Sequence, residues 1–367
     1  MNDSKKQDIK EVKLMKGNEA IAHAAIRCGC DGYFGYPITP QSEIMETLME
    51  LEPWNTTGMV VLQAESETSS INMVYGGAGC GKKTMTSSSS PGVSLMQEGM
   101  SYIACAELPC VVVNVMRGGP GLGTIQPSQA DYFQSVKGGG HGDYKLITLA
   151  PASVQEMADY TVKAFELAFK YLTPVLLLAD GIIGQMMEKV VLPPFQPRMT
   201  EAEIREKYPW ATLGKPANRK PNVITSLALE AEEMEATNLR LQRKYREIEK
   251  NEVLFEEFSC EDAEYLIVAF GITARICQKT VEMARSQGIK AGLLRPITLF
   301  PFPTEQISRY ADKTKGMLSV ELSAGQMVED VRLAVNGRVQ VEFYGRMGGI
   351  VPSPDEVLKA LKDKVVK

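Results

Sequence analysis

Short apolar runs alternate with longer amphipathic stretches through the first half of the chain. The apolar runs are rich in β-branched residues and predict strands. They are Tyr33–Tyr36, Met59–Gln63, Lys83–Ser88, Cys110–Arg117, Lys145–Ala150 and Pro174–Asp180. The stretches between them predict helices at Asn18–Cys28, Gln41–Leu51, Glu67–Gly79, Pro91–Ala104 and Ser153–Tyr171. Mostly apolar strands alternating with helices are typical of a parallel sheet covered on both faces, so we expect an α/β domain over residues 12–195.

A proline-rich segment, Pro193–Pro197, ends this pattern, because proline interrupts both helices and central strands. The charged stretch Leu227–Glu257 follows, and its apolar residues Leu241, Tyr245 and Ile248 are spaced three and four apart. This spacing predicts an amphipathic helix packed on a surface. We therefore expect residues 196–258 to form a linker that carries this helix.

A second alternation begins near Cys260. Strands are predicted at Tyr265–Phe270, Ala291–Leu294, Met317–Val320 and Val339–Tyr344. Helices are predicted at Thr273–Gln287, Thr304–Asp312, Gln326–Val335 and Asp355–Leu361. The pattern indicates a second, smaller α/β domain over residues 259–367.

Composition narrows the functional classes. A chain of 367 residues with a net charge of -5 lacks the basic surplus of a nucleic-acid-binding protein. No apolar run approaches the roughly 18–20 residues of a membrane span, and the polar start of the chain does not resemble a signal peptide. We expect a soluble, cytoplasmic protein that binds neither nucleic acid nor membrane.

Cysteine and histidine usage bears on metal chemistry. The seven cysteines are scattered without a Cys-x-x-Cys run, and there are only two histidines. The odd count and the scatter predict reduced thiols, and the chain offers neither an iron–sulfur nor a zinc ligand set. We expect no metal on this chain, so that any redox metal would belong to another chain.

Candidate chemistry lies in loops after the strands of the first domain, the edge where open α/β sheets bind ligands. Thr39 could cap the helix that Pro40 begins, or it could offer its hydroxyl, with the helix N-terminus, to an anionic ligand. Arg117 ends a strand and suits a substrate carboxylate, although a structural ion pair is an equal alternative. His141 lies in a glycine-rich loop and is better explained as a loop residue than as a general base.

Two carboxylates, Glu65 and Glu67, stand at a junction of strand and helix. Each could stabilise the helix dipole, or act as an acid or base if buried. Because they are two residues apart they diverge on a helix, so we expect one of them to face the site. The segment Gly118–Thr124 matches neither G-x-G-x-x-G nor a P-loop, which excludes nucleoside triphosphate binding of that kind.

Taken in order, these segments resemble a known family. The motifs are Gly-Tyr-Pro-Ile-Thr-Pro at 35–40, Gln-Ala-Glu-Ser-Glu at 63–67, Ser-Ser-Pro-Gly-Val-Ser-Leu-Met at 89–96 and Gly-Gly-Pro-Gly-Leu-Gly-Thr at 118–124. They resemble the alpha subunit of the 2-oxoacid:ferredoxin oxidoreductases, which are thiamine diphosphate enzymes, and especially the type that acts on 3-methyl-2-oxobutanoate. The segment Arg295–Pro303 extends the likeness to a transketolase C-terminal-like domain.

The resemblance implies roles for individual residues. The first domain would bind the pyrimidine half of thiamine diphosphate, and a glutamate nine residues before a helix glycine would hydrogen-bond the ring nitrogen N1′. Counting back from Gly76 selects Glu67 over Glu65. Thr39 and Arg117 match positions near the substrate, with Arg117 at its carboxylate. The other positions implied in cofactor binding are Pro37, Ile38, Ser89 and Gly92.

The resemblance also implies partners. The family's diphosphate motif is absent: Ala179–Gly181 is its nearest counterpart and no suitable asparagine follows. A beta subunit would supply diphosphate binding and Mg²⁺, iron–sulfur clusters would lie on partner subunits, and gamma and ferredoxin-like delta subunits would complete a hetero-oligomer. The implied reaction is oxidative decarboxylation to the acyl-coenzyme A with reduction of ferredoxin.

Three alternatives stay open. A 2-oxoglutarate or pyruvate version of the enzyme would keep the family and change the substrate. A non-catalytic binding or scaffold protein of the same fold would have lost the chemistry, which the joint presence of Glu67, Thr39 and Arg117 disfavours. A stand-alone transketolase-like enzyme is disfavoured by the missing diphosphate motif.

Overall fold

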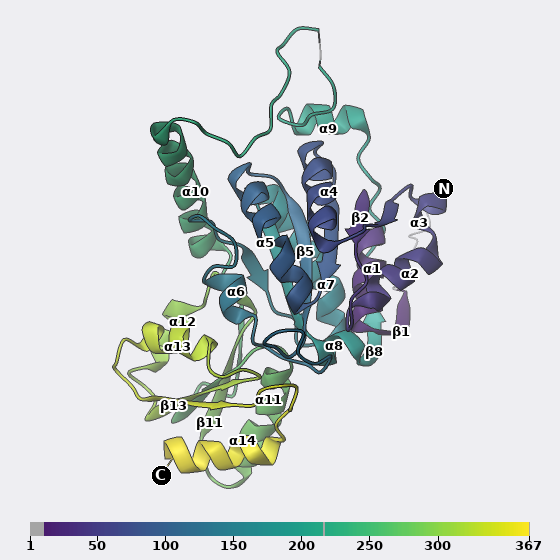
Figure 1. Ribbon diagram of the computed structural model, residues 1–367. Coiled ribbons are helices and arrows are strands. Elements are labelled where there is room, and N and C mark those ends of the chain that lie inside the picture. The colour runs from purple at the N-terminus through teal and green to yellow at the C-terminus, as the bar shows by residue number, and fades with distance from the viewer. Residues whose placement is uncertain (1–10, 216, 367) are drawn as a thin grey trace, which may run out of the picture.

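The computed structural model describes residues 11–215 and 217–366. Its largest sheet has seven strands in the order β12-β6-β7-β5-β4-β2-β3 (Figure 1). These strands are β2 (Gly32–Gly35), β3 (Val60–Gln63), β4 (Thr84–Ser88), β5 (Cys110–Met116), β6 (Ile147–Leu149), β7 (Pro174–Asp180) and β12 (Thr298–Phe300). All neighbours pair in parallel except β12, which is antiparallel to β6.

Helices cover both faces of this sheet, as the apolar strands predict. Alternate residues of β5 divide between two cores: Val111 and Val113 pack in one with α1 (Gly17–Arg27) and α7 (Val154–Tyr171). Val112 and Met116 pack in the other core, which includes α4 (Glu67–Gly79) and α5 (Ser90–Cys105). The remaining helices of this unit are α2 (Ser42–Leu51), α3 (Pro53–Thr56), α6 (Tyr132–Val136), α8 (Gly181–Gln185) and α9 (Glu201–Lys207).

The second unit is a smaller α/β sheet of five strands in the order β14-β13-β10-β11-β9. The strands are β9 (Phe255–Phe258), β10 (Tyr265–Val268), β11 (Ala291–Pro296), β13 (Gly316–Glu321) and β14 (Val341–Gly345), of which β9 alone is antiparallel to its neighbour. The helices are α11 (Gly271–Ser286), α12 (Thr304–Tyr310), α13 (Met327–Val335) and α14 (Pro354–Leu361), followed by a π-helical turn, Lys362–Val366. The α/β class expected for both parts of the chain is confirmed.

Two short strands pair with sheets that the sequence pattern does not indicate for them. β9 lies inside the predicted linker, 196–258, yet it pairs with β11 of the second sheet. β12 lies inside the predicted second domain, yet it pairs with β6 of the first sheet, with Thr298 opposite Leu149. A further antiparallel ribbon, β1 (Val12–Lys16) with β8 (Met187–Val191), was also not predicted.

The predicted amphipathic helix is present as α10 (Ala231–Asn251), shorter at both ends than the charged stretch that indicated it. Its residues Leu241, Tyr245 and Ile248 are buried and belong to the core that α1 and α7 share. The three- and four-residue spacing therefore placed its buried side correctly. None of the helices in the described part of the chain is long and apolar enough to cross a membrane.

Candidate active site

The loops that carry the predicted residues meet at the carboxyl edge of the large sheet. Because β3, β2, β4 and β5 are parallel and adjacent, the segments that follow them leave the sheet on the same side. The second unit borders this edge: Gly118, just after β5, lies close enough to the loop after β14 that an added Cβ would be 3.3 Å from the carbonyl carbon of Gly348.

Glu67 and Glu65 diverge as their spacing predicts. Glu67 is the first residue of α4 and is 6% exposed, whereas Glu65 is exposed and accepts a hydrogen bond of 3.2 Å from Ser69 Oγ. Ser66 caps the helix by accepting from the Ser69 amide at 3.2 Å. Of the two carboxylates, Glu67 is therefore the one held in the interior of the fold.

Gly92 in the first turn of α5 packs directly against Glu67. A Cβ at Gly92 would lie 2.5 Å from Glu67 Oε1 and 2.0 Å from Ser88 Oγ. The hydroxyls of Ser88 and Ser89 are buried and have no hydrogen-bond partner in the described chain. Buried polar groups are nearly always paired in native proteins, so unpaired hydroxyls beside a buried carboxylate mark a polar site. These residues fit an uncharged nitrogen heterocycle such as an aminopyrimidine, which offers both donors and acceptors.

Substituting Gly92 tests this close packing. We expect Gly92→Ala to displace Glu67, to destabilise the chain by about 1–3 kcal/mol through overpacking, and to lower the enzymatic turnover that the family resemblance implies. Gly76→Ala is the matched control, because Gly76 lies on the exposed side of α4 with no atom within 4 Å of an added Cβ. That control should be neutral or stabilising by up to about 1 kcal/mol. Thermal melting and steady-state turnover would check both, and equal behaviour of the two variants would contradict the packing argument.

The loop after β2 corrects one expectation. Thr39 does not cap α2: the helix begins at Ser42 with Gln41 as its N-cap, because Thr39 and Pro40 form a turn before it. Gln41 instead secures the loop, since its Nε2 donates to the Tyr36 carbonyl at 3.2 Å and its Oε1 accepts from Ser87 Oγ at 2.6 Å. Pro37 and Thr39 remain exposed and Ile38 half-buried at this edge.

Arg117 joins two loops of the site. Its Nη1 donates to the Thr39 carbonyl and its Nη2 to the Leu122 carbonyl, both at 3.0 Å, while Nε is buried without a partner in the described chain. The side chain is 6% exposed. Leu122 belongs to the glycine-rich loop, where Gly121 and Gly123 adopt left-handed conformations. Within the residues that the structure describes Arg117 forms no ion pair, so the alternative of a structural ion pair finds no support.

Asp180 is fully engaged at the end of β7, as expected for a strand-end residue. It is 1% exposed, its Oδ1 accepts from the Ile183 amide at 3.2 Å and its Oδ2 from the Ile272 amide at 2.8 Å. Burial raises the pKa of this carboxyl to about 6, although the backbone N–H groups oppose the rise. Asp180 therefore links α8 to α11 and does not face the candidate site.

His141 lies away from the site. Its ring packs edge-on against Tyr102 with 6.0 Å between centroids, and its carbonyl accepts from Ser101 Oγ at 2.7 Å. Both contacts are on the C-terminal half of α5, whereas Ser89 and Gly92 are at the opposite end of that helix. The interpretation of His141 as an ordinary loop residue agrees with this position.

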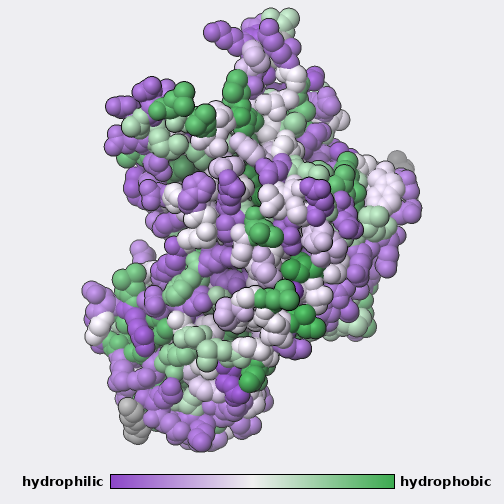
Figure 2. Space-filling view, viewed as in Figure 1, coloured by the Kyte–Doolittle hydropathy of each residue, from purple (hydrophilic) through white to green (hydrophobic). Residues whose placement is uncertain are grey.

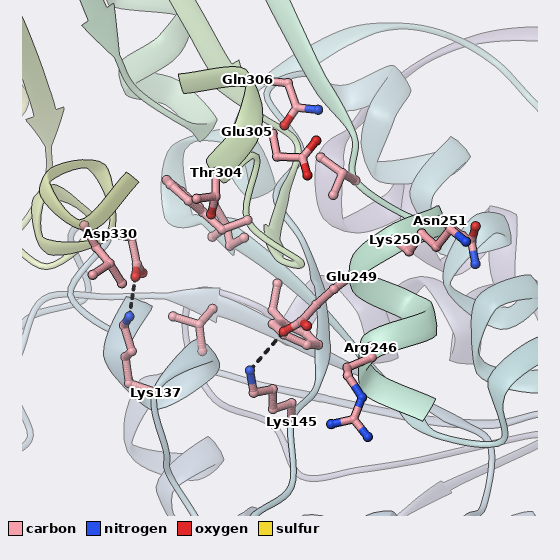
Figure 3. A pocket seen from close by; sticks show the side chains of 16 residues that line it. Lys137, Lys145, Arg246, Glu249, Lys250, Asn251, Thr304, Glu305, Gln306 and Asp330 are labelled. Atoms are coloured by element: carbon pink, nitrogen blue, oxygen red, sulfur yellow. Dashed lines mark hydrogen bonds and ion pairs between the residues drawn. The ribbon is translucent and has the colours of Figure 1, made fainter. Parts of the chain in front are cut away.

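A deep cavity is also separate from the predicted residues. It measures about 1020 Å³ and lies between α10, β12 and the N-terminus of α12. Figure 3 shows two ion pairs beside it, Lys137 with Asp330 and Lys145 with Glu249, the latter at 3.1 Å. A second cavity of about 730 Å³ includes Thr39 in its lining. In the described ranges no three His, Cys, Asp or Glu side chains gather to hold a metal ion, and all seven cysteines are free.

Sequence reasoning placed Ser90 at this edge but did not identify Asn114 and Asp131. Asp131 Oδ2 accepts from Ser90 Oγ at 2.6 Å and from Asn114 Nδ2 at 2.9 Å. An aspartate directly before an aromatic helical segment is a helix-start signal, and Asp131 is indeed the N-cap of α6. Its partners are 17 and 41 residues away, so no local pattern could indicate them.

Comparisons with known proteins identify the class. Residues 23–254 match the family model described as "Pyruvate flavodoxin/ferredoxin oxidoreductase, thiamine diP-bdg", and residues 263–357 match "Pyruvate:ferredoxin oxidoreductase core domain II". The chain belongs to the 2-oxoacid:ferredoxin oxidoreductase family, and its first unit is the thiamine diphosphate-binding domain of that family. The resemblance inferred from the ordered motifs is thus confirmed.

Individual relatives refine this placement. The chain is 50% identical over 96% of its length, and 97% of the relative's, to ketoisovalerate oxidoreductase subunit VorB of Methanothermobacter marburgensis. It is 39% identical to 2-oxoglutarate synthase subunit KorA of Archaeoglobus fulgidus, covering 92% of this chain and 96% of that one. A solved 2-oxoglutarate:ferredoxin oxidoreductase from Magnetococcus marinus, with 2-oxoglutarate, coenzyme A and succinyl-CoA bound, superposes with a TM-score of 0.81 at 26% identity. That match covers 97% of this chain and 66% of the other.

Proposed function

We propose that this chain is the pyrimidine-binding subunit of an enzyme that oxidatively decarboxylates 3-methyl-2-oxobutanoate to the acyl-coenzyme A and reduces ferredoxin. The substrate assignment rests on the 50% sequence identity to a ketoisovalerate oxidoreductase subunit, compared with 39% identity to a 2-oxoglutarate synthase subunit. The geometry that supports the chemistry is the buried Glu67 beside Gly92 and the unpaired hydroxyls of Ser88 and Ser89.

Thiamine diphosphate, when bound, supplies the nucleophilic carbon and the electron sink for decarboxylation. Glu67 would share a proton with the ring nitrogen N1′, because its carboxylate is held in a polar site shielded from water. Four further residues would hold the aminopyrimidine ring by close approach and hydrogen bonding: Pro37, Ile38, Ser89 and Gly92.

Arg117 and Thr39 would orient the substrate. The guanidinium already binds the backbone of two loops with one bond from each terminal nitrogen, and each of these nitrogens has a second N–H group. A carboxylate placed against them would receive charge-assisted hydrogen bonds at the rim where Thr39 is exposed. Arg117 would thereby fix the substrate and the two loops in one geometry.

The subunit would act as part of a hetero-oligomer. Asp180 is engaged with backbone amides, so the nearest counterpart of the family's diphosphate motif is not free to hold Mg²⁺. A beta subunit would supply the diphosphate half and Mg²⁺, and gamma and ferredoxin-like delta subunits would provide iron–sulfur clusters and the path to ferredoxin. Exposed apolar residues from two adjoining loops, Leu122 and Ile125 with Met347 and Ile350, support a partner at this edge. Figure 2 shows hydrophobic residues exposed on this face between the two units.

The native complex, purified through this chain, tests the proposal. We expect coenzyme A-dependent reduction of a viologen dye, fastest with 3-methyl-2-oxobutanoate among a panel of 2-oxoacids, together with partner chains and iron–sulfur absorbance. Fastest turnover on 2-oxoglutarate or pyruvate would keep the family and overturn the substrate. Absence of partners and of activity on every 2-oxoacid would favour a binding protein of the same fold.

A further inference from the structure

A chain of polar contacts runs from the backbone of Arg117 to Asp131. The Arg117 amide donates to Ser90 Oγ at 3.1 Å, and that hydroxyl donates to Asp131 Oδ2 at 2.6 Å. Asn114 on β5 donates to the same Asp131 oxygen at 2.9 Å. Burial raises the pKa of the Asp131 carboxyl, while the hydrogen bonds from Ser90 and Asn114 lower it. Asp131 therefore fixes Ser90, and Ser90 fixes the point at which Arg117 leaves the sheet.

The second unit holds the segment just before Asp131. The Gln129 backbone N–H donates to the Leu322 carbonyl at 2.9 Å, and the side-chain Oε1 of Gln129 accepts from the Leu322 backbone N–H at 3.1 Å. Its Nε2 reaches the Phe270 carbonyl at 2.9 Å, and Ser128 Oγ also donates to the Leu322 carbonyl, at 3.3 Å. These bonds tie the segment to the carboxyl ends of two strands of the second sheet, β10 and β13.

Gln326, the N-cap of α13, holds the backbone on both sides of Asp131. Its Nε2 donates to the Ala130 carbonyl at 2.7 Å, and its Oε1 accepts from the Phe133 amide at 2.8 Å. The backbone on either side of Asp131 is thus held by one side chain of the second unit. Because Gln326 makes one bond on each side, it restricts both the position and the direction of the Asp131 side chain.

Asp330, one helical turn beyond Gln326, secures α6. Its Oδ2 accepts from Tyr132 Oη at 2.6 Å, and its Oδ1 pairs with Lys137 at the other end of that short helix (Figure 3). Tyr132 directly follows Asp131 and is fully buried. Leu322, Gln326 and Asp330 together place α6 and its N-cap against the first unit.

We propose that Asp131 is a positioning residue through which the second unit sets the orientation of Arg117 toward the substrate carboxylate. The inference rests on the proposed function, because it takes Arg117 as the group that binds the 2-oxoacid. It assigns a task to the second unit in this chain: its residues fix the Asp131–Ser90 link that holds Arg117.

Removing the middle of the link is the first test. In the assembled complex, Ser90→Ala deletes the hydroxyl that connects Asp131 to Arg117, and we expect the KM for the 2-oxoacid to rise about tenfold. The KM for coenzyme A and the cofactor content should stay unchanged, which a general loss of structure would not produce. Ser94→Ala is the matched control, because Ser94 is exposed one turn further along α5, and it should leave both KM values unchanged.

Further variants at Asp131 and Gln326 separate positioning from charge and from stability. Asp131→Asn keeps an oxygen that can accept from Ser90 and Asn114, so it should stay within about threefold of the wild-type KM, whereas Asp131→Ala should match Ser90→Ala. In the second unit, Gln326→Ala should also raise the KM for the 2-oxoacid. Combining Gln326→Ala with Ser90→Ala should raise that KM little further, because both substitutions interrupt the same chain of contacts.

The outcomes are distinct. An unchanged KM for the 2-oxoacid in Ser90→Ala overturns the inference, as does full additivity of the Gln326 and Ser90 variants. Ser90→Ala keeps the test decisive even if Asp131→Ala fails to fold. A wild-type complex that turns over no 2-oxoacid would instead overturn the proposed function on which the inference rests.

Discussion

In the assembled enzyme, Glu67→Gln should lower kcat by about 10²- to 10⁴-fold with little change in cofactor content. The substitution keeps the size and shape of the side chain and removes the proton-sharing carboxylate that the proposed function assigns to the ring nitrogen N1′. Glu67 is 6% exposed and packs against Gly92, so no water or neighbouring side chain can readily take its place. Single-turnover decarboxylation and bound-cofactor measurements would check the effect.

Glu65→Gln is the matched control for this prediction. Glu65 is exposed and its recorded partner is the hydroxyl of Ser69, so its replacement should leave turnover within about twofold. An unchanged rate in Glu67→Gln would remove the catalytic assignment. A large loss in Glu65→Gln with a normal Glu67→Gln would exchange the two roles.

Most elements of both sheets could be predicted because their signals are local. The helix Glu67–Gly79 and the strand Pro174–Asp180 were predicted with the bounds that the structure shows. Both have strong local boundaries: a serine cap precedes the helix, and an unbroken apolar run forms the strand. The divergence of Glu65 and Glu67 was predictable for the same reason, since residues two apart do not share a helix face.

What the sequence could not indicate depends on distant partners. β9 and β12 have only four and three residues. Each is a strand because it pairs with a strand at least 35 residues away in the sequence: β9 with the later β11, and β12 with the earlier β6. Thr39 was wrongly expected to cap α2, because sequence alone does not show that Pro40 stays outside the helix. The link from Asp131 through Ser90 to Arg117 likewise joins the N-cap of α6, the start of α5 and the end of β5, so only the folded chain reveals it.

Glu321 is a buried carboxylate that accepts five hydrogen bonds from described residues. It is 0% exposed at the end of β13, and its Oε1 accepts from the Val328 amide at 2.9 Å and Ser319 Oγ at 3.1 Å. Its Oε2 accepts from the amides of Gln326 and Met327 at 2.9 and 3.0 Å. The carboxylate thus satisfies the free N–H groups at the start of α13, where the helix dipole also favours negative charge.

We therefore expect Glu321→Gln to destabilise the chain by about 3 kcal/mol, because its amide group must face at least one N–H donor. For a chain of this size that loss lowers Tm by roughly 4 °C. Glu329→Gln is the matched control: Glu329 is exposed in the first turn of the same helix, so its loss should cost under about 1 kcal/mol. Thermal melting of the two variants would check this.

Equal Tm values for Glu321→Gln and the wild type would show that the hydrogen bonds at this helix start are replaceable. If the Tm falls as expected, we also expect an effect at the proposed substrate site. Glu321 holds the backbone of Gln326 at the start of α13, and the Gln326 side chain holds the backbone of Ala130 and Phe133. Loosening that start should therefore raise the KM for the 2-oxoacid at temperatures below unfolding. The carboxylate would then act on the site through the position of the Gln326 side chain.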